Sequence, residues 1–238
     1  IGKISRSAGV YRFPDDAKGL FAMYRKIYDN TDGLVTPLIG QTLSDAGYNS
    51  NYSFKPKKLE KPPDWNDVME YNFPNLTVKK PIQLDFGAAG KGYIIDIVAE
   101  ILIKANIKSF CIDAGGDILH KNLDGKSIQV GLENPENINQ IIGVANINNQ
   151  SICGSAGNRR KWDKFHHIIN PKTLKSPIEI LAVWTVAKNA FLGDAMTTCL
   201  FFCPVKKILK NFKFEYLILK KDFSIEKSPN FPAEIFTT

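Results

Sequence analysis

Cysteine, histidine and long apolar runs are scarce in this sequence, and each scarcity argues against a class of protein. Among 238 residues there are 4 cysteines and 3 histidines, with no Cys-x-x-Cys pair and no Cys/His spacing of a zinc site. Cys199 and Cys203 lie one helical turn apart, a spacing that seldom forms a disulfide. The sequence therefore argues against a zinc module and leaves the redox compartment open.

No apolar segment approaches the roughly 20 residues that a membrane-spanning helix needs. Asp96 and Glu100 interrupt the longest candidate, residues 94–103. The net charge of +7 comes from scattered lysines, which indicate a solvated basic surface, so we expect no nucleic-acid binding. Because the chain begins at Ile1 and not at Met, we expect that an N-terminal portion is missing, and the lack of a signal peptide is uninformative about export.

The order of the predicted elements favours an α+β fold. Apolar spacing predicts helices over residues 15–30, 92–106 and 190–202, and a short one near residues 65–70. Residues 30–48 are predicted to be rich in loops. Strands are predicted at residues 109–115, 117–121, 127–133, 140–147, 165–171 and 181–188, with a final hairpin turning near Lys221 and Asp222. Because strands and helices do not alternate strictly, we expect mixed or antiparallel sheets with flanking helices and no Rossmann fold.

A glycine-rich stretch precedes one predicted helix in the sequence LDFGAAGKGYIIDIVAEIL, residues 84–102. The backbone N–H groups of Gly87, Gly90 and Gly92 can approach an anion closely, and a helix N-terminus attracts negative charge. Lys91 can place a positive charge on a phosphate oxygen. Neither the Walker A nor the Rossmann glycine pattern is met. A strand-to-helix turn without any ligand explains the stretch equally well.

Two further motifs are a glycine bend and a histidine pair. In DAGGDIL, Gly115 and Gly116 stand between aspartates, and give either a plain turn or a sharp bend that a flat ligand can approach. In FHHIINPKT, His166 and His167 are adjacent, so they point to opposite faces of an extended segment. One of them can be a buried core histidine while the other faces a site.

A carboxylate and two hydroxyls follow in GDAMTTCLFF. On a helix, Asp194 and Thr198 project from one face at positions i and i+4, with Thr197 close to that face. Carboxylate and hydroxyl oxygens suit Mg²⁺, which shares its shell with water and with substrate phosphates. The alternative is an aspartate that caps the helix and a threonine that bonds its own backbone.

In this order the four motifs resemble the ApbE family, the FAD:protein FMN transferases. Similar segments are also KISRSAG near the start, TDGLVTPLIGQTLSDAGY at residues 31–48 and GSAGNRR at residues 154–160. The resemblance spans nearly the whole chain. It implies a single ApbE-type domain over residues 1–238, with its N-terminal portion missing.

The resemblance implies an enzyme that binds FAD as substrate, with Mg²⁺ at the pyrophosphate. Such an enzyme transfers FMN to a threonine or serine hydroxyl of an acceptor protein and releases AMP. Two alternatives stay open on the same site: an FAD pyrophosphatase, in which water replaces the hydroxyl, and a non-catalytic FAD-binding protein. By analogy we expect export and a lipid anchor on the outer face of the bacterial cytoplasmic membrane, with a cytoplasmic location still open. Membrane association would then come only from the missing N-terminal anchor.

The resemblance also implies roles for individual residues. The metal ligands would be the carbonyl of Ala88 and the side chains of Asp194 and Thr198, with Thr197 as an additional contributor. A base must take the proton of the acceptor hydroxyl, and we assign this role to His167, with Asp194 as the alternative. The expected cofactor contacts are Gly47, Tyr48, Asp85, Lys91, Gly115, Gly116, Asp117, His167 and Ile168.

The chain departs from the family pattern at five positions. Asn170 stands where the family usually has an aspartate, and Leu174 replaces the glycine of a turn. Ala156 and Asn158 replace a serine and an aspartate, and Ala46 replaces an aromatic residue. These departures spare the metal and pyrophosphate residues and fall on the acceptor and flavin-stacking side.

Overall fold

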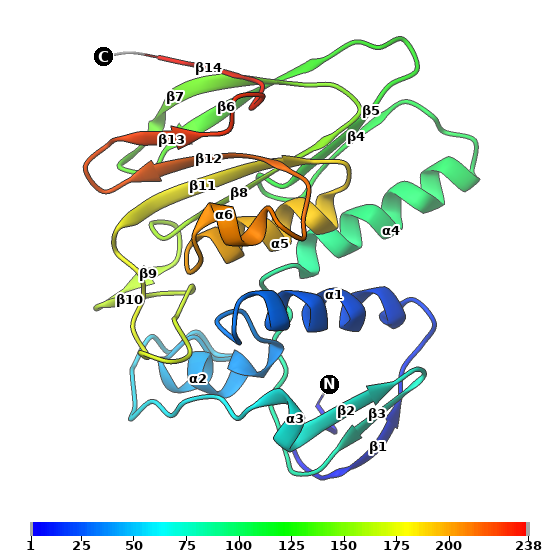
Figure 1. The fold of residues 1–238 in the computed structure, drawn as a ribbon, viewed down its shortest axis with the longest axis vertical. Coiled ribbons are helices and arrows are strands. Elements are labelled where there is room, and N and C mark those ends of the chain that lie inside the picture. The colour runs from blue at the N-terminus through cyan, green and yellow to red at the C-terminus, as the bar shows by residue number, and fades with distance from the viewer. Residues whose placement is uncertain (1, 237–238) are drawn as a thin grey trace. The chain divides into compact units, whose positions relative to one another are not determined.

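The strand pairs of the described residues are all antiparallel, and they form four sheets. The structure is a computed structural model that describes residues 2–236. Together with the flanking helices, these sheets confirm the α+β prediction, and the described part of the chain contains no doubly wound parallel sheet. Two compact units divide the chain (Figure 1): Ile1–Ala88 with Lys161–Pro177, and Ala89–Arg160 with Ile178–Thr238. The single domain expected from the sequence stays a prediction.

Two stacked sheets form the core of the second unit. The larger has the strand order β13-β12-β11-β8-β5-β4 and the smaller the order β14-β7-β6. The strands are β4 (Phe110–Asp113), β5 (Ile118–Lys121), β6 (Ile128–Asn134), β7 (Asn137–Ile147), β8 (Ser151–Ala156), β11 (Ile180–Ala187), β12 (Glu215–Lys220), β13 (Ile225–Lys227) and β14 (Ala233–Ile235).

Strand β11 shows why the larger sheet is buried on both faces. Successive side chains of a strand point to opposite faces. Ala182, Trp184 and Val186 accordingly join the apolar core shared with Leu132 and Ile147 of the smaller sheet. On the opposite face, Thr185 donates a hydrogen bond of 2.8 Å from its hydroxyl to the carbonyl of Gly193. This face carries the helices.

Helices α4 (Gly90–Lys104), α5 (Ala190–Leu200) and α6 (Val205–Ile208) belong to the second unit, and α4 and α5 lie on the larger sheet. Ile95 and Ala99 of α4 and Ala190 of α5 pack with Leu119 and Cys153 of the sheet. The helices therefore form the third layer of this unit.

None of the helices in residues 2–236 is long and apolar enough to cross a membrane.

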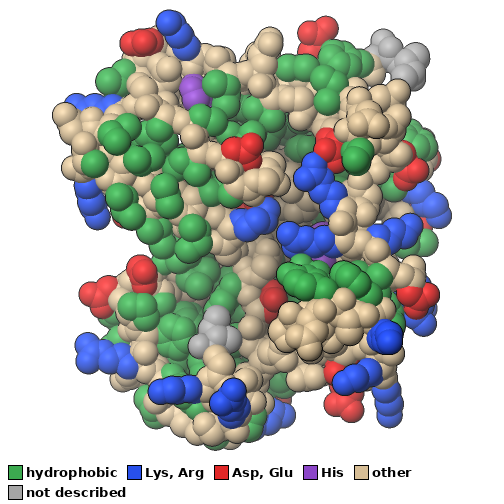
Figure 2. All heavy atoms as spheres, turned by 180° about the vertical axis from the view of Figure 1, so that it is seen from behind, with side chains coloured by type: hydrophobic (Ala, Val, Ile, Leu, Met, Phe, Trp, Pro, Cys, Tyr) green, Lys and Arg blue, Asp and Glu red, His purple; other side chains and the backbone are tan. Residues whose placement is uncertain are grey.

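Helix α4 also has apolar side chains on the side that faces away from the sheet. Ile94, Val98 and Ile101 recur at helical spacing and are all exposed. Figure 2 shows apolar side chains gathered over the surface on the left, where this helix lies. The long apolar run read in the sequence therefore has one buried and one exposed face.

The first unit combines a small sheet with short helices. Its sheet has the order β1-β3-β2, and β9 pairs with β10 separately. The elements are β1 (Gly9–Arg12), α1 (Ala17–Asn30), η1 (Pro37–Ile39), α2 (Gly40–Asp45), α3 (Trp65–Val68), β2 (Met69–Asn72), β3 (Asn75–Val78), β9 (Lys161–Trp162) and β10 (Phe165–His166). A second apolar cluster of Leu43, Ala46, Trp162, Phe165 and Ile169 joins α2 to β9 and β10.

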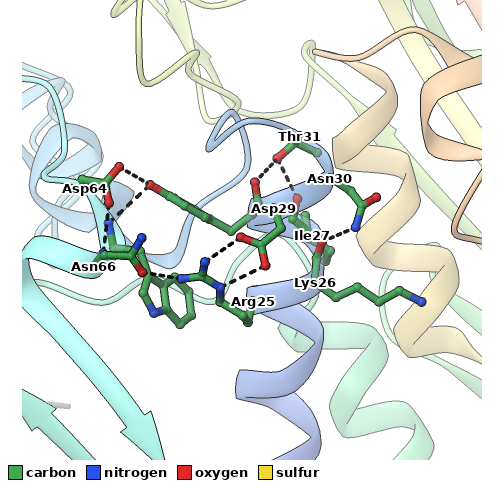
Figure 3. A network of polar contacts seen from close by, with 10 residues as sticks. Arg25, Lys26, Ile27, Asp29, Asn30, Thr31, Asp64 and Asn66 are labelled. Atoms are coloured by element: carbon green, nitrogen blue, oxygen red, sulfur yellow. Dashed lines mark hydrogen bonds and ion pairs between the residues drawn. The ribbon is translucent and has the colours of Figure 1, made fainter.

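Polar contacts join α1 to α3 within the first unit (Figure 3). The guanidinium of Arg25 pairs with Asp29 one turn along α1 and donates a bond of 2.8 Å to the side-chain oxygen of Asn66. The hydroxyl of Tyr28 donates to Asp64, whose other carboxylate oxygen accepts from the N–H of Asn66. Asp64 thereby caps α3 and ties it to α1.

Three predictions of local structure need correction. Residues 30–48 contain the 3₁₀ turn η1 and helix α2, because the side chain of Thr36 caps η1 by accepting from Leu38. The helix predicted to residue 70 ends at Val68, because Met69 pairs with Val78 in the sheet. The strand predicted over residues 165–171 ends at His166.

The chain after His166 turns because Asn170 organises it. The side-chain oxygen of Asn170 accepts the N–H groups of Lys172 (2.9 Å) and Thr173 (3.1 Å). Leu174 then adopts a φ of 58°, and its N–H donates to the carbonyl of Asn170. The amide oxygen of Asn170 thus accepts as a carboxylate oxygen does, while the glycine-type conformation at position 174 is held by a leucine.

The backbone at Leu174 predicts how two substitutions there differ in stability. A left-handed conformation costs a non-glycine residue roughly 1–2 kcal/mol, which exceeds the entropic cost of glycine, roughly 0.5–1 kcal/mol. Leu174→Gly should therefore have a free energy of unfolding about 1 kcal/mol higher than Leu174→Ala. Leu174→Ala is the matched control because it loses the same side-chain contacts. Urea unfolding of both variants checks this, and equal midpoints would contradict the assigned strain.

Candidate functional site

Asp194 is a buried carboxylate near the N-termini of helices α4 and α5. It lies one turn into α5, and the residue is 2% exposed. The N–H of Gly92, in the first turn of α4, donates to it over 2.9 Å. The first N–H groups of a helix have no partner within the helix and attract negative charge. Asp194 therefore both faces and caps the beginning of α4.

The glycine bend places a second carboxylate near Asp194. Gly115 and Gly116 both have positive φ, and the N–H of Ala114 donates to the carbonyl of Asp117 across them. This is a tight hairpin between β4 and β5. Asp117 is fully buried, accepts from the N–H of Gly154 over 3.2 Å and forms an ion pair with Lys91.

The charges of this cluster do not cancel. Burial, followed by the charge of Asp117, raises the pKa of Asp194 to about 7, although Lys91 and the N–H of Gly92 oppose the shift. Burial would lower the pKa of Lys91, but the charges of Asp117 and Asp194 outweigh it and raise that pKa. When Asp194 is ionised, one ammonium group stands against two buried carboxylates, and the cluster is one positive charge short.

The two threonines of α5 differ in their surroundings. Thr197 is fully buried, and its hydroxyl donates to the carbonyl of Asp194 (2.6 Å) and shares a bond of 2.8 Å with the hydroxyl of Ser155. Thr198 is half-buried, one turn after Asp194. The predicted alternative, in which a threonine bonds its own backbone, describes Thr197. Its role as an additional metal ligand stays a prediction.

The donor set fits a hard divalent cation. Within residues 2–236, no three His, Cys, Asp or Glu side chains come together as a metal cluster. A cation bound at Asp194 would therefore complete its shell with neutral oxygens, water or phosphate, as Mg²⁺ does. The missing positive charge of the cluster is the observation that favours such an ion.

The first unit holds the remaining predicted residues. The side chain of Asp85 accepts from the N–H of Gly87 over 2.8 Å, and its own N–H donates to Pro37. Ala88 follows in the same turn and is half-buried. Asp85 therefore shapes the glycine-rich turn.

Gly47 and Tyr48 lie against an aromatic cluster in the first unit. A Cβ at Gly47 would come within 2.6 Å of the backbone nitrogen of Lys55, and its φ is 100°, so only glycine fits. The ring of Tyr48 stacks on that of Trp162 at 5.6 Å and 14°. Trp162 donates from its indole nitrogen to the carbonyl of Ala46 over 2.7 Å, and both residues belong to the same apolar cluster.

The two histidines have different surroundings. His166 is buried, and its Nε2 lies 2.8 Å from the carbonyl oxygen of Pro177. Burial lowers the pKa of this histidine. Its Nδ1 accepts from the N–H of Ile168, which is itself buried. His167 is half-buried with its ring 6.5 Å from that of Tyr48, so His166 is the core histidine.

Comparison with known proteins places the chain in a family. The model of the ApbE family matches residues 1–217. The chain belongs to the ApbE family. The FAD:protein FMN transferase of Haemophilus influenzae is 29% identical over 155 residues, which cover 59% of this chain and 44% of that protein. The one of Escherichia coli K12 is 26% identical over 167 residues, 64% of this chain and 47% of that protein. The matches thus span less than half the length of these ApbE relatives.

Solved structures support the fold. The ApbE protein of Thermotoga maritima superposes with a TM-score of 0.85 at 20% identity, covering 98% of this chain and 83% of that one. The flavin transferase ApbE of Vibrio cholerae gives a TM-score of 0.72 at 16% identity, covering 97% of this chain and 80% of that one. At these identities the likeness shows an ApbE-type fold alone.

One residue of this ApbE chain was missed as part of the site. In the sequence Asp96 only interrupts an apolar run, yet in the structure it accepts hydrogen bonds from the first two N–H groups of α5. The signal was its position, since Gly92, Asp96 and Ala99 recur at i, i+4 and i+7. A carboxylate on the buried stripe of an apolar helix needs a partner.

The raised pKa of Asp194 predicts a pH-dependent stability. In metal-free protein the folded state holds a proton on Asp194 that the unfolded chain, with an aspartate pKa of about 3.9, has already lost. The stability that this group contributes is therefore present below about pH 4 and lost as pH rises towards about 7. Asp194→Asn stays neutral, so its stability relative to wild type should rise across this window. Urea unfolding in EDTA at several pH values checks this, and parallel curves would contradict it.

Proposed function

We propose that this chain acts as a Mg²⁺-dependent FAD:protein FMN transferase. It would move the FMN half of FAD to a threonine or serine hydroxyl of an acceptor protein and release AMP. The observation that carries the proposal is the buried cluster of Asp194, Asp117 and Lys91, one positive charge short at the start of α4. The name shared by the curated ApbE relatives supports the same activity.

The metal would be held by hard oxygens. We assign the carboxylate of Asp194, the hydroxyl of Thr198 and the carbonyl of Ala88 as its ligands, with Thr197 contributing beside them. When bound, Mg²⁺ would neutralise charge on the pyrophosphate of FAD. The side chain of Lys91 is 40% exposed, so its ammonium can reach a phosphate while Asp117 orients it.

The flavin nucleotide would lie along the remaining residues. We assign Gly47, Tyr48 and Ile168 to the flavin side, because the segments that contain them resemble those that line the flavin pocket in the family. Asp85 would contact the nucleotide. The bend of Gly115 and Gly116 offers room for a flat ligand, because a Cβ at either glycine would meet no atom within 4 Å.

The transfer requires a base in addition to the metal. The acceptor oxygen forms a bond to the phosphorus of the FMN half, and the bond from that phosphorus to the oxygen leaving with AMP breaks. His167 is our proposed base for the hydroxyl proton, because it is half-buried whereas His166 is buried in the core. Asp194 is the alternative, but a carboxylate that binds Mg²⁺ is poorly placed to accept a proton as well.

An acceptor assay tests the proposal. The chain is incubated with FAD, Mg²⁺ and an acceptor protein that carries the target threonine, and covalent flavin is detected by fluorescence after denaturing electrophoresis and by mass. We expect flavinylated acceptor plus AMP, and Asp194→Ala should reduce the rate at least about 100-fold because the site loses its charged ligand. Asp124→Ala, an exposed carboxylate of the same unit, is the matched control and should leave the rate unchanged.

The same assay separates the alternatives. FMN and AMP formed without acceptor would indicate an FAD pyrophosphatase, in which water takes the place of the hydroxyl. FAD that binds and stays intact would indicate a binding protein. Full activity of Asp194→Ala would contradict the metal assignment. By family analogy we also propose export and a lipid anchor on the outer face of the bacterial cytoplasmic membrane, which membrane fractionation of the full-length protein tests.

A further inference from the structure

Helices α4 and α5 cap each other's N-termini. Asp96 of α4 accepts the N–H of Ala190 over 2.9 Å and that of Phe191 over 3.0 Å, the first two residues of α5. In return Asp194 of α5 accepts the N–H of Gly92 in the first turn of α4. Each helix therefore supplies the carboxylate that satisfies the N-terminal N–H groups of the other.

The contacts of Asp96 fix where α5 begins. The first N–H groups of a helix need partners from outside it, and bonds from N–H groups to a carboxylate are among the stronger hydrogen bonds. The side chain of Asn189 accepts from Leu192 over 3.1 Å. Asp96 supplies the acceptor for the two N–H groups before it, so the whole first turn is held.

The backbones of α4 and α5 are closely packed where the two helices cross. A Cβ on Gly92 would come within 2.2 Å of the carbonyl oxygen of Ala190 and within 2.8 Å of the Cβ of Asp194. The backbone of α4 thus touches the first turn of α5 directly. Because Asp194 lies four residues after Ala190, a shift of that turn moves its carboxylate by a similar amount.

We propose that Asp96 is a positioning residue, which holds the first turn of α5 so that the carboxylate of Asp194 is presented to the metal. This inference rests on the metal site of the proposed function. Asp96 acts through the backbone of Ala190 and Phe191, and so the part of α5 that bears Asp194 and Thr198 moves as one piece. Residues that hold a metal ligand in place without contacting the metal typically contribute 10- to 100-fold to the affinity for the metal.

The test measures metal binding directly. Mn²⁺ replaces Mg²⁺ as a paramagnetic probe, and its dissociation constant is measured by EPR on the folded full chain in the presence of FAD. Asp96→Asn keeps the side-chain volume but turns an amide NH₂ towards one of the two N–H groups. We expect Mn²⁺ to bind this variant about 10-fold more weakly. Glu100→Gln, one turn further along α4 with its side chain 71% exposed, is the matched control and should bind as wild type does.

A second variant covers the case in which Asp96→Asn does not fold. Asp96→Glu keeps the charge and both acceptor oxygens but moves them by one methylene, so it should fold and still bind Mn²⁺ more weakly. A lower melting temperature with an unchanged dissociation constant, in either variant, would overturn the positioning role, as would failure of both variants to fold. Wild-type protein that binds Mn²⁺ but does not flavinylate an acceptor would refute the proposed function alone. Wild-type protein that binds no Mn²⁺ would refute the metal site and this inference together.

Discussion

The burial of Asp194 is the constraint on which the second unit depends. A carboxylate that is 2% exposed needs partners, and it has the N–H of Gly92 at the start of α4 and the ammonium of Lys91 nearby. Lys91 forms an ion pair with the neighbouring Asp117. The fold therefore places two buried carboxylates beside one ammonium group, which is unfavourable unless a proton or a cation joins them.

The rest of this unit positions that charge. The larger sheet provides Asp117 through the hairpin of Gly115 and Gly116, and its strand β8 supplies the N–H of Gly154 and the hydroxyl of Ser155. The opposite face of the sheet is packed against the smaller sheet, so β8 and β11 have little freedom to move. Two helices then cross at Gly92 and cap one another, which holds the carboxylate of Asp194 at the N–H of Gly92.

Most helices and many strands could be predicted from the sequence, and the features that could not be predicted have physical causes. Strong apolar periodicity located α1, α4, α5 and most strands, and the spacing of Asp194 and Thr198 identified the helix that carries the carboxylate. Strands β1, β2, β3, β8, β9 and β14 were not predicted, because two to six residues with mixed polarity carry little periodic signal. The ion pair of Lys91 with Asp117 joins residues 26 positions apart, and such pairing depends on how the hairpin meets the helix. The position of Asp96 on the buried stripe of α4 indicates that it needs a partner, but the sequence does not show that this partner is the first turn of α5.

The central claim is that the charge deficit at Asp194 is met by a divalent cation. The most direct measurement is anomalous diffraction at the manganese edge from crystals grown with FAD and Mn²⁺. The account predicts an anomalous peak within bonding distance of a carboxylate oxygen of Asp194. Well-ordered FAD with no peak at Asp194, or with Lys91 alone contacting the pyrophosphate, would contradict it.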